Sequence, residues 1–366
     1  MPIHIAKPLL GDEEIAAVTR VLKSGMIASG PETIAFEQEF AQFVGSKYAC
    51  AVNNGTAALT LALLAVGIGP GDEVITTPMT FVATANAILS CGATPVFADI
   101  DEETFNLSPE STKAAITERT KAIMPVHLYG LPADMDAFRK IADGHGLHLI
   151  GDAAQAHGAG IGERKVGTLA EIECFSFYPT KNMTTGEGGM VTTNNKELYH
   201  LLDSIRNHGR FDSQLGVYEH IRFGLNLRMT DIGSAIGRVQ LRKLSNFNEI
   251  RNRNAEMFLE GLGDLEGVIL PSAPNGFNHV WHQFTIRSND RESLAAYLKD
   301  EGIETRTYYP RLIQDYPHLE KFSAKCPVAN RVVGEVISLP VHPGLSGQDV
   351  EHIIQSIRAW SLQIKV

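Results

Sequence analysis

The sequence contains few cysteines and none of the cysteine spacings that metal sites and disulfide frameworks use. Its four cysteines are Cys50, Cys91, Cys174 and Cys326, and no C-x-x-C pair occurs among them. Cys50 and Cys174 lie inside apolar runs that resemble strands. We therefore expect buried, free thiols, without a cysteine metal centre or a disulfide scaffold.

Positive charge is also scarce. The 366-residue chain has 32 Lys and Arg against 42 Asp and Glu, which gives a formal net charge of -10. Because nucleic acids and anionic membranes require a basic face, this balance argues against broad binding to either. No apolar run reaches the length of a membrane span, and the start MPIHIAKPLLGDEE lacks the features of a signal peptide. The expected location is the cytoplasm.

The common nucleotide-binding loops are absent as well. No G-x-x-x-x-G-K-[ST] segment occurs, and GAGIGE at 158–163 lacks the last glycine of G-x-G-x-x-G. A phosphate site in this chain is therefore neither a P-loop nor a dinucleotide fingerprint.

Short apolar runs that alternate with helical patterns fill the first two thirds of the chain. Continuous apolar runs of this kind are typical of strands buried on both faces. The predicted strands are 48–52, 73–76, 95–99, 121–127, 147–152, 173–177 and 189–193. The predicted helices are 56–66, 80–90, 109–117, 132–143 and 197–207. This alternation predicts an α/β fold with a mostly parallel seven-stranded sheet flanked by helices.

The pattern changes near residue 240. A long polar helix is predicted over about 229–262, and the elements after it are fewer and more widely separated. They are strands at 282–287 and 304–309 and helices at 291–301 and 348–361. We therefore expect a large domain at 1–240, with an N-terminal arm, and a smaller α+β domain at 241–366.

Three predicted strands end in polar residues, at the sheet edge where α/β proteins bind ligands. Gly55 and Thr56 follow the first strand and open a helix whose free N–H groups suit a phosphate. Asp152 follows a second strand, and Lys181 follows a third. Each feature alone has a simpler interpretation: an ordinary helix cap, an aspartate capping a turn, and a solvated surface lysine.

Pyridoxal phosphate (PLP) accounts for these features jointly. Its aldehyde needs a lysine amine for a Schiff base, its pyridine nitrogen needs a carboxylate, and its phosphate needs backbone donors and hydroxyls. Lys181, Asp152 and the helix start at Gly55 supply these groups. Phe81, at another strand end, is the candidate for a ring on the pyridine face, with a core phenylalanine as the alternative.

Motifs of one protein family run along nearly the whole chain. In order they are KPLLGDEE, SGMIASGP, NNGTAALTLAL, GPGDEVITTPMTFVATANAI, PVHLYG, GDAAQAHGA, FSFYPTKNMTTGEGGM, RNHG, GLNLRMTDIGSAIG and SLPVHP. By these segments the sequence resembles the DegT/DnrJ/EryC1/StrS family of sugar aminotransferases, within the aspartate-aminotransferase-like fold (fold type I). The resemblance implies pyridoxal 5'-phosphate as the cofactor.

The resemblance also implies roles for individual residues around the cofactor ring. Lys181 matches the Schiff-base lysine, and Asp152 matches the partner of the pyridine nitrogen. Gln155 matches the glutamine beside the ring hydroxyl, and Phe81 matches the stacking aromatic. These roles make Lys181 and Asp152 the catalytic pair.

Further matching positions concern the cofactor phosphate. Gly55, Thr56 and Ser176 match the phosphate site within one chain. Asn226, in GLNLRM, matches an asparagine that reaches the phosphate of the neighbouring subunit's cofactor, with a surface helix cap as the alternative. A homodimer with shared active sites is implied, and we expect the polar loop at 207–223 to order against the partner.

The implied reaction is transfer of an amino group, with L-glutamate as donor, to a nucleotide-linked keto-sugar. A 4-keto-6-deoxyhexose is expected ahead of a 3-keto sugar. The alternatives are a keto-inositol aminotransferase, a sugar dehydratase and a non-catalytic PLP-binding regulator. Dehydratases of this scaffold carry histidine where Lys181 stands, and the regulators usually add a DNA-binding domain.

One segment departs from the family pattern. Relatives often show a Tyr-Pro-x-Pro-Leu-His run near the substrate, whereas this chain has YYPRLIQDYP at 308–317, with Ile313 near the usual histidine. The identity of the sugar is therefore left open by the sequence.

Overall fold

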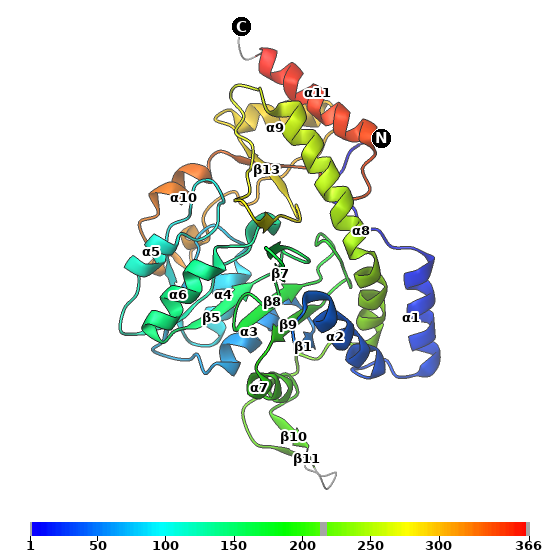
Figure 1. The fold of residues 1–366 in the computed structure, drawn as a ribbon, viewed down its shortest axis with the longest axis vertical. Coiled ribbons are helices and arrows are strands. Elements are labelled where there is room, and N and C mark those ends of the chain that lie inside the picture. Colours follow the sequence, from blue (N-terminus) through cyan, green and yellow to red (C-terminus); the bar gives the residue numbers. More distant parts are fainter. Residues whose placement is uncertain (1, 213–217, 364–366) are drawn as a thin grey trace.

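A seven-stranded sheet forms the centre of the computed structural model, which describes residues 2–212 and 218–363 (Figure 1). Its strand order is β1-β9-β8-β5-β4-β2-β3. The strands are β1 (Tyr48–Val52), β2 (Glu73–Thr76), β3 (Thr94–Phe97), β4 (Thr120–Ile123), β5 (His148–Asp152), β8 (Ile172–Ser176) and β9 (Gly189–Thr193). All neighbours pair in parallel except β9, which is antiparallel to both β1 and β8. The predicted α/β fold with a mostly parallel seven-stranded sheet is confirmed.

Helices cover both faces of this sheet at the places where the sequence predicted them. They are α3 (Gly55–Ala65), α4 (Ala83–Ser90), α5 (Pro109–Ala114), α6 (Met135–His145) and α7 (Lys196–Arg206). Successive side chains of a strand enter different hydrophobic clusters, as the period of two requires. In β8, Phe175 packs with Phe138 of α6 on one face, whereas Cys174 packs with Leu61 of α3 on the other.

Two helices near the N-terminus were not predicted. They are α1 (Asp12–Ser24) and α2 (Pro31–Val44), and both pack against the long helix α8 (Asp231–Leu262). Asp231 Oδ1 accepts hydrogen bonds from Gly30 N at 2.7 Å and from Thr33 N at 3.0 Å, so the start of α8 is tied to the start of α2. The expected N-terminal arm is thus largely helical.

The smaller α+β domain lies at the C-terminal end of α8 (Figure 1). Its main elements are β13 (Phe284–Arg287), α9 (Arg291–Asp300), α10 (Pro327–Val332), β14 (Val336–Leu339) and α11 (Gly347–Gln363). The short elements elsewhere are η1 (Leu128–Gly130), β6 (Gly160–Ile161), β7 (Arg164–Lys165), β10 (Arg210–Asp212), β11 (Tyr218–His220), β12 (Phe277–Asn278), η2 (Ile313–Asp315) and η3 (Glu320–Phe322). The expected boundary between 240 and 241 falls inside α8 and stays a prediction.

The predicted strand at 304–309 is wrong. Arg306 forms an isolated bridge with Ser338 of β14, but the chain then leaves the sheet. The Tyr129 hydroxyl donates to the carbonyl of Tyr308, and Gln155 Nε2 donates to the Tyr309 hydroxyl at 3.0 Å. These contacts draw both tyrosines toward the large domain, so tertiary structure overrides their strand propensity.

Two expectations about composition can be compared with the structure. All four cysteines are free and buried, as predicted. Within residues 2–212 and 218–363, no helix combines the length and the apolar character needed to cross a membrane.

Candidate functional site

The predicted site lies where β5 and β8 end side by side. The two strands pair in parallel with Asp152 opposite Cys174, and Ala153 N donates to Cys174 O at 2.8 Å. Because parallel strands end at the same edge of a sheet, the loop after Asp152 and the loop that carries Lys181 lie next to each other. The strand ends that carry Asp152 and Lys181 are thus neighbours in the sheet.

Asp152 is a buried carboxylate with few donors. Its side chain is 4% exposed. It accepts a hydrogen bond from Thr84 Oγ1 at 2.8 Å and another from Ala154 N at 3.2 Å. Burial raises the pKa of Asp152, while the bond from Thr84 and the nearby charges of Lys181 and His127 act in the opposite direction. The site therefore favours a cationic partner for this carboxylate.

Lys181 follows a turn after β8, in which Lys181 N donates to Tyr178 O at 2.9 Å. Its side chain is partly exposed. Desolvation lowers the pKa of Lys181 from 10.5 to about 8, and the charge of Asp152 opposes this change. A solvated surface lysine would keep its ordinary pKa. The amine is thus partly neutral near physiological pH, as a nucleophile or proton acceptor requires.

The N-terminus of α3 lies against the end of β8. Asn54 caps the helix by accepting a hydrogen bond from Ala57 N at 2.8 Å. A Cβ atom on Gly55 would lie 2.6 Å from Ser176 Cβ, so only glycine permits this approach. Thr56 is exposed on the first turn, beside the free N–H groups of the helix. The predicted phosphate residues Gly55, Thr56 and Ser176 therefore come together, although an ordinary N-cap is also present.

Phe81 lies outside the core. Its side chain is 57% exposed, so the alternative of a core phenylalanine does not hold. Its ring centroid lies 6.3 Å from that of Tyr309. Thr84, three residues later, donates to Asp152, which places this segment beside the buried carboxylate. An open aromatic face near Asp152 suits a planar ligand.

Gln155 and two tyrosines form a hydrogen-bonded network at the same edge. Gln155 Oε1 accepts from Tyr129 N at 2.7 Å, which leaves Gln155 Nε2 to donate to the Tyr309 hydroxyl. Tyr129 adopts a φ of 57°, in the left-handed region that non-glycine residues rarely occupy. The sequence analysis did not assign Tyr129 or Tyr309 to the site. The segment YYPRLIQDYP was the available signal, because it departs from the family pattern.

These side chains fit PLP in chemical terms. A buried carboxylate without a full set of donors matches a protonated ring nitrogen, and a lysine with a lowered pKa matches the aldehyde. The N-terminus of α3, where Gly55 allows a close approach to Ser176 and hydroxyl groups lie nearby, suits a phosphate.

Asn226 lies in the segment that passes the end of β1. It forms an isolated bridge with Asn207, and its side chain is exposed. Leu227 O accepts from Asn53 N at 2.9 Å, so the segment runs along the end of β1. Thr230 caps α8 by accepting from Gly233 N at 3.2 Å, so Asn226 does not cap that helix. The structure does not join Asn226 to Lys181 through any hydrogen bond among the described residues.

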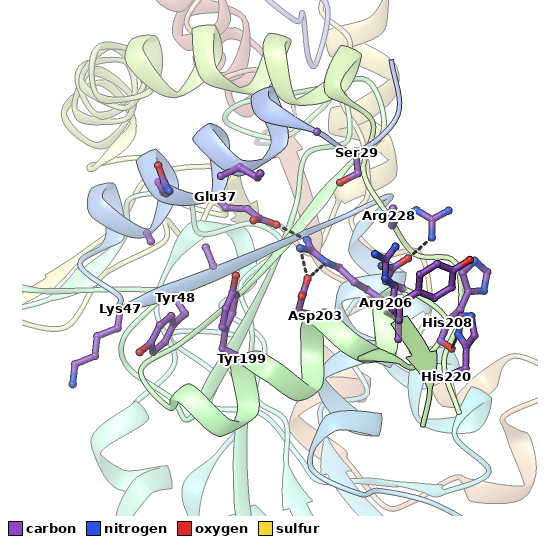
Figure 2. A pocket seen from close by; sticks show the side chains of 18 residues that line it. Ser29, Glu37, Lys47, Tyr48, Tyr199, Asp203, Arg206, His208, His220 and Arg228 are labelled. Atoms are coloured by element: carbon purple, nitrogen blue, oxygen red, sulfur yellow. Dashed lines mark hydrogen bonds and ion pairs between the residues drawn. The ribbon is translucent and has the colours of Figure 1, made fainter. Parts of the chain in front are cut away.

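A separate cavity of about 1080 Å³ lies between α2, the start of β1, α7 and the β10–β11 hairpin (Figure 2). Arg206 crosses its floor between two carboxylates: Arg206 Nη1 donates to Glu37, and Arg206 Nη2 donates to Asp203 at 2.7 Å. Tyr48 and Tyr199 stack beside this group with centroids 4.9 Å apart. Lys181 and Asp152 do not line the cavity. The sequence analysis did not predict it, because α2 was not predicted.

Comparison with known proteins places the chain among aminotransferases. The family model described as "DegT/DnrJ/EryC1/StrS aminotransferase family" matches residues 8–358. A Streptomyces venezuelae relative, named dTDP-3-amino-3,4,6-trideoxy-alpha-D-glucose transaminase, is 41% identical across 96% of this chain and 93% of its own. An Acidithiobacillus ferrooxidans relative, named UDP-N-acetyl-3-dehydro-alpha-D-glucosamine 3-aminotransferase, is 42% identical across 95% and 94%.

A solved structure shows the same fold in three dimensions. The crystal structure of Streptomyces venezuelae DesV in complex with a ketimine intermediate superposes with a TM-score of 0.91 at 40% identity. The superposition covers 95% of this chain and 94% of that chain. The similarity thus extends over both domains.

Proposed function

The chain belongs to the DegT/DnrJ/EryC1/StrS aminotransferase family, and we propose that it aminates a nucleotide-linked 3-keto sugar. As a member of this family it is a PLP-dependent sugar aminotransferase. One observation carries the assignment of the site: Lys181 and Asp152 stand at the adjacent ends of β5 and β8, each with a pKa altered by burial. Perturbed groups of this kind gather at catalytic sites.

The keto position is proposed from the names of the relatives. Both curated relatives described above are named for an amino group, or an amino transfer, at position 3 of the sugar. We therefore place a 3-keto substrate ahead of the 4-keto substrate that the sequence analysis favoured. Glutamate stays the proposed amino donor on the family resemblance alone.

The chemistry divides between the cofactor and the chain. When bound, PLP supplies an aldehyde that accepts the amino group and a ring that draws electrons from the donor's α-carbon. Lys181 would hold the cofactor aldehyde through Nζ, and the same amine would move the proton at the donor's α-carbon. Asp152 would keep the ring nitrogen protonated, and Gln155 would orient the ring hydroxyl.

The test of this proposal has two parts. Borohydride reduction of the purified enzyme should attach the cofactor to the peptide that contains Lys181, and label on another lysine would contradict the site. A panel of 3-keto and 4-keto nucleotide sugars should then be offered with glutamate, with release of 2-oxoglutarate as the signal. Turnover with 4-keto sugars alone would overturn the 3-keto assignment and leave the site intact.

We also propose a homodimer whose active sites are shared through Asn226. Large apolar side chains are exposed on the α1–α2 connection, on the first turns of α2 and near the β10–β11 hairpin; they are Met26, Ile27, Ile34, Phe211, Tyr218, Ile221 and Phe223. Residues 213–217 of the expected partner-contacting loop lie outside the described residues. The exposed side chain of Asn226 is available to a second copy.

Mixed subunits provide the test of shared sites. Lys181→Ala chains should be inactive because they lack the amine that would hold the cofactor. Asn226→Asp chains should be inactive because the new carboxylate repels the cofactor phosphate. After subunit exchange, hybrid dimers contain one site with both defects and one with neither. Activity should return to about a quarter of the parental value, because half of the dimers are hybrids. A mixture that stays inactive although the chains exchange would contradict the shared site.

A further inference from the structure

Two buried asparagines connect the loop of Lys181 with the loop of Asp152. Asn182, next to Lys181, is 3% exposed, and Asn248 of α8 is 9% exposed. Asn182 Nδ2 donates to Asn248 Oδ1 at 2.9 Å, and Asn248 Nδ2 donates to His157 O at 2.8 Å. His157 lies five residues after Asp152, on the loop that also carries Gln155. One side chain of α8 therefore contacts both loops of the site.

The hydrogen-bond partners determine the orientation of both amides. Asn182 Nδ2 faces two acceptors, Asn248 Oδ1 and the carbonyl of Val280, the latter also at 2.9 Å. Asn248 Nδ2 faces the carbonyl of His157. Turning the Asn182 amide, or turning the Asn248 amide, would set oxygen against oxygen in a buried place, where unpaired polar groups are costly. The connection is therefore directional and has a single arrangement.

Gly158 makes room for this connection. Its φ is 88°, and a Cβ atom at this position would lie 2.8 Å from Asn248 Nδ2. A side chain here would push Asn248 away from the carbonyl of His157. The close approach of α8 to the loop thus depends on glycine.

We propose that Asn248 is a positioning residue that holds Lys181 at its working distance from Asp152. Its amide fixes the two loops to one rigid helix, and α8 extends from Asp231 at the large domain to Leu262 at the small domain. Catalytic groups need such support, because small displacements weaken proton transfer strongly. The inference rests on the proposed roles of Lys181 and Asp152.

The pKa of Lys181 reports on this arrangement. The groups that face Lys181 are Asp152, His157 and His282, with Arg251 of α8 beside both histidines. Burial lowers the pKa of His157 to about 3 and that of His282 well below its ordinary value, so both rings are neutral near pH 7. Loosening the loops admits water to the amine and raises the pKa of Lys181 from about 8 toward 10.5.

The chain offers a matched control on the same helix. Asn254 is 1% exposed, and its Nδ2 donates to the carbonyls of Val341 and His342, both at 3.4 Å. Asn254→Leu removes a buried amide from α8 without touching either loop. Asn248→Leu removes an amide of the same size that touches both.

The experiment measures the pKa of Lys181 in the cofactor-free protein, from the pH dependence of its acetylation followed on the Lys181 peptide by mass spectrometry. Asn248→Leu should raise this pKa by at least one unit and weaken PLP binding tenfold or more. Asn254→Leu should lower the unfolding temperature but leave the pKa of Lys181 within about 0.3 units of the parent and the affinity for PLP within twofold.

Two further variants keep the test decisive if Asn248→Leu does not fold. Asn182→Ala and Gly158→Ala break the same connection from its two ends, so each should raise the pKa of Lys181, and combining them should add little to the larger single effect. An unchanged pKa in every folded variant of this set would overturn the positioning role. Borohydride labelling of Lys181 in the parent separates that outcome from failure of the proposed site.

Discussion

Two pairs of oppositely charged side chains occupy different regions of this molecule, and their hydrogen bonding is completed to different degrees. Arg206 and Glu37, at the cavity of Figure 2, are bonded to each other, and Arg206 also bonds Asp203 and the carbonyl of Ala51. Lys181 and Asp152 influence each other's pKa, but Asp152 accepts only from a hydroxyl and a backbone N–H among the described hydrogen bonds. The charged groups of the first pair have their hydrogen-bond partners within the chain, whereas Asp152 of the second pair can still accept a hydrogen bond from a ligand.

The difference separates the cavity of Figure 2 from the proposed site. That cavity, of about 1080 Å³, is lined by the satisfied pair of Arg206 and Glu37. The proposed site is recognised by incomplete bonding and by groups from several strand ends. Four substitutions test whether the two regions differ in this way.

Replacing Lys181 should have the largest effect. Lys181→Met removes the amine that holds the cofactor and moves the proton, so transamination should fall to background. The variant should fold, because methionine fills similar space without a buried charge. Stopped-flow mixing with glutamate should show no change in cofactor absorbance. A variant with more than about a hundredth of parental turnover, equivalent to about 2.7 kcal/mol, would contradict the role.

The same variant should also reveal a pH dependence of stability. In the cofactor-free parent the pKa of Lys181 is about 8 when folded and near 10.5 when unfolded. Between these values the unfolded chain binds the extra proton, so parental stability rises as pH increases from 8 to 10.5. Lys181→Met lacks this rise and should have its greatest advantage below pH 8. Urea unfolding of both proteins across this range measures the difference.

Asp152→Asn should have the next largest effect. The amide cannot hold a proton on the ring nitrogen by charge, so the barrier should rise by about 4 to 6 kcal/mol, or several powers of ten in kcat. Cofactor binding should change far less, because Thr84 and Ala154 still position the side chain. A variant within a few-fold of the parent would mean that Asp152 does not face the cofactor.

Glu37→Gln should damage stability and spare the chemistry. Removing the charge of Glu37 leaves the buried Arg206 with Asp203 as its remaining carboxylate, at an expected loss of up to about 3 to 5 kcal/mol in the free energy of unfolding. Glu39→Gln is the matched control on α2, since Glu39 pairs with Arg238 near the surface and should contribute no more than about 1 kcal/mol. Turnover per folded molecule should match the parent in both. A loss of kcat in Glu37→Gln but not in Glu39→Gln would contradict the prediction that the Arg206–Glu37 pair contributes to stability alone.

Tyr309→Phe should have the smallest effect. The change removes the acceptor for Gln155 Nε2 and should lower kcat/KM about two- to tenfold, as expected for one hydrogen bond worth about 0.5 to 1.5 kcal/mol. Tyr316→Phe, in the same C-terminal segment, serves as control. If the loss appears with the keto-sugar but not with glutamate alone, Tyr309 acts on the sugar half of the reaction.

The sequence predicted the strands of the sheet well because each buried strand appears as a short, continuous apolar run. Runs such as LHLIGD and ECFSF are typical of strands buried on both faces, and their ends indicated Asp152 and Lys181 without tertiary information. The antiparallel direction of β9 was not readable, since pairing direction leaves no mark in a short apolar run. Helices α1 and α2 were missed, and both are held by contacts with α8, which is distant in sequence.

The parts of the site that the sequence could not predict depend on contacts between distant segments. Tyr309 reaches Gln155 across 154 residues, and Asn248 reaches Asn182 across 66. Neither contact follows from spacing or propensity. The strand predicted at 304–309 failed for the same reason, because Tyr308 and Tyr309 are held by the large domain.

The short bridge between Ile3 and Ile303 has a consequence for how the protein is made. Ile3 belongs to the same hydrophobic cluster as Phe284, Ile357 and Trp360, so the smaller domain contains residues from both ends of the chain. During synthesis the first segment leaves the ribosome long before its partners exist. The central sheet can form while translation continues, but this domain can close only after α11, which carries Ile357 and Trp360, has left the ribosome. Ribosome-bound chains should therefore acquire a protease-resistant sheet first and protection of their N-terminal residues last.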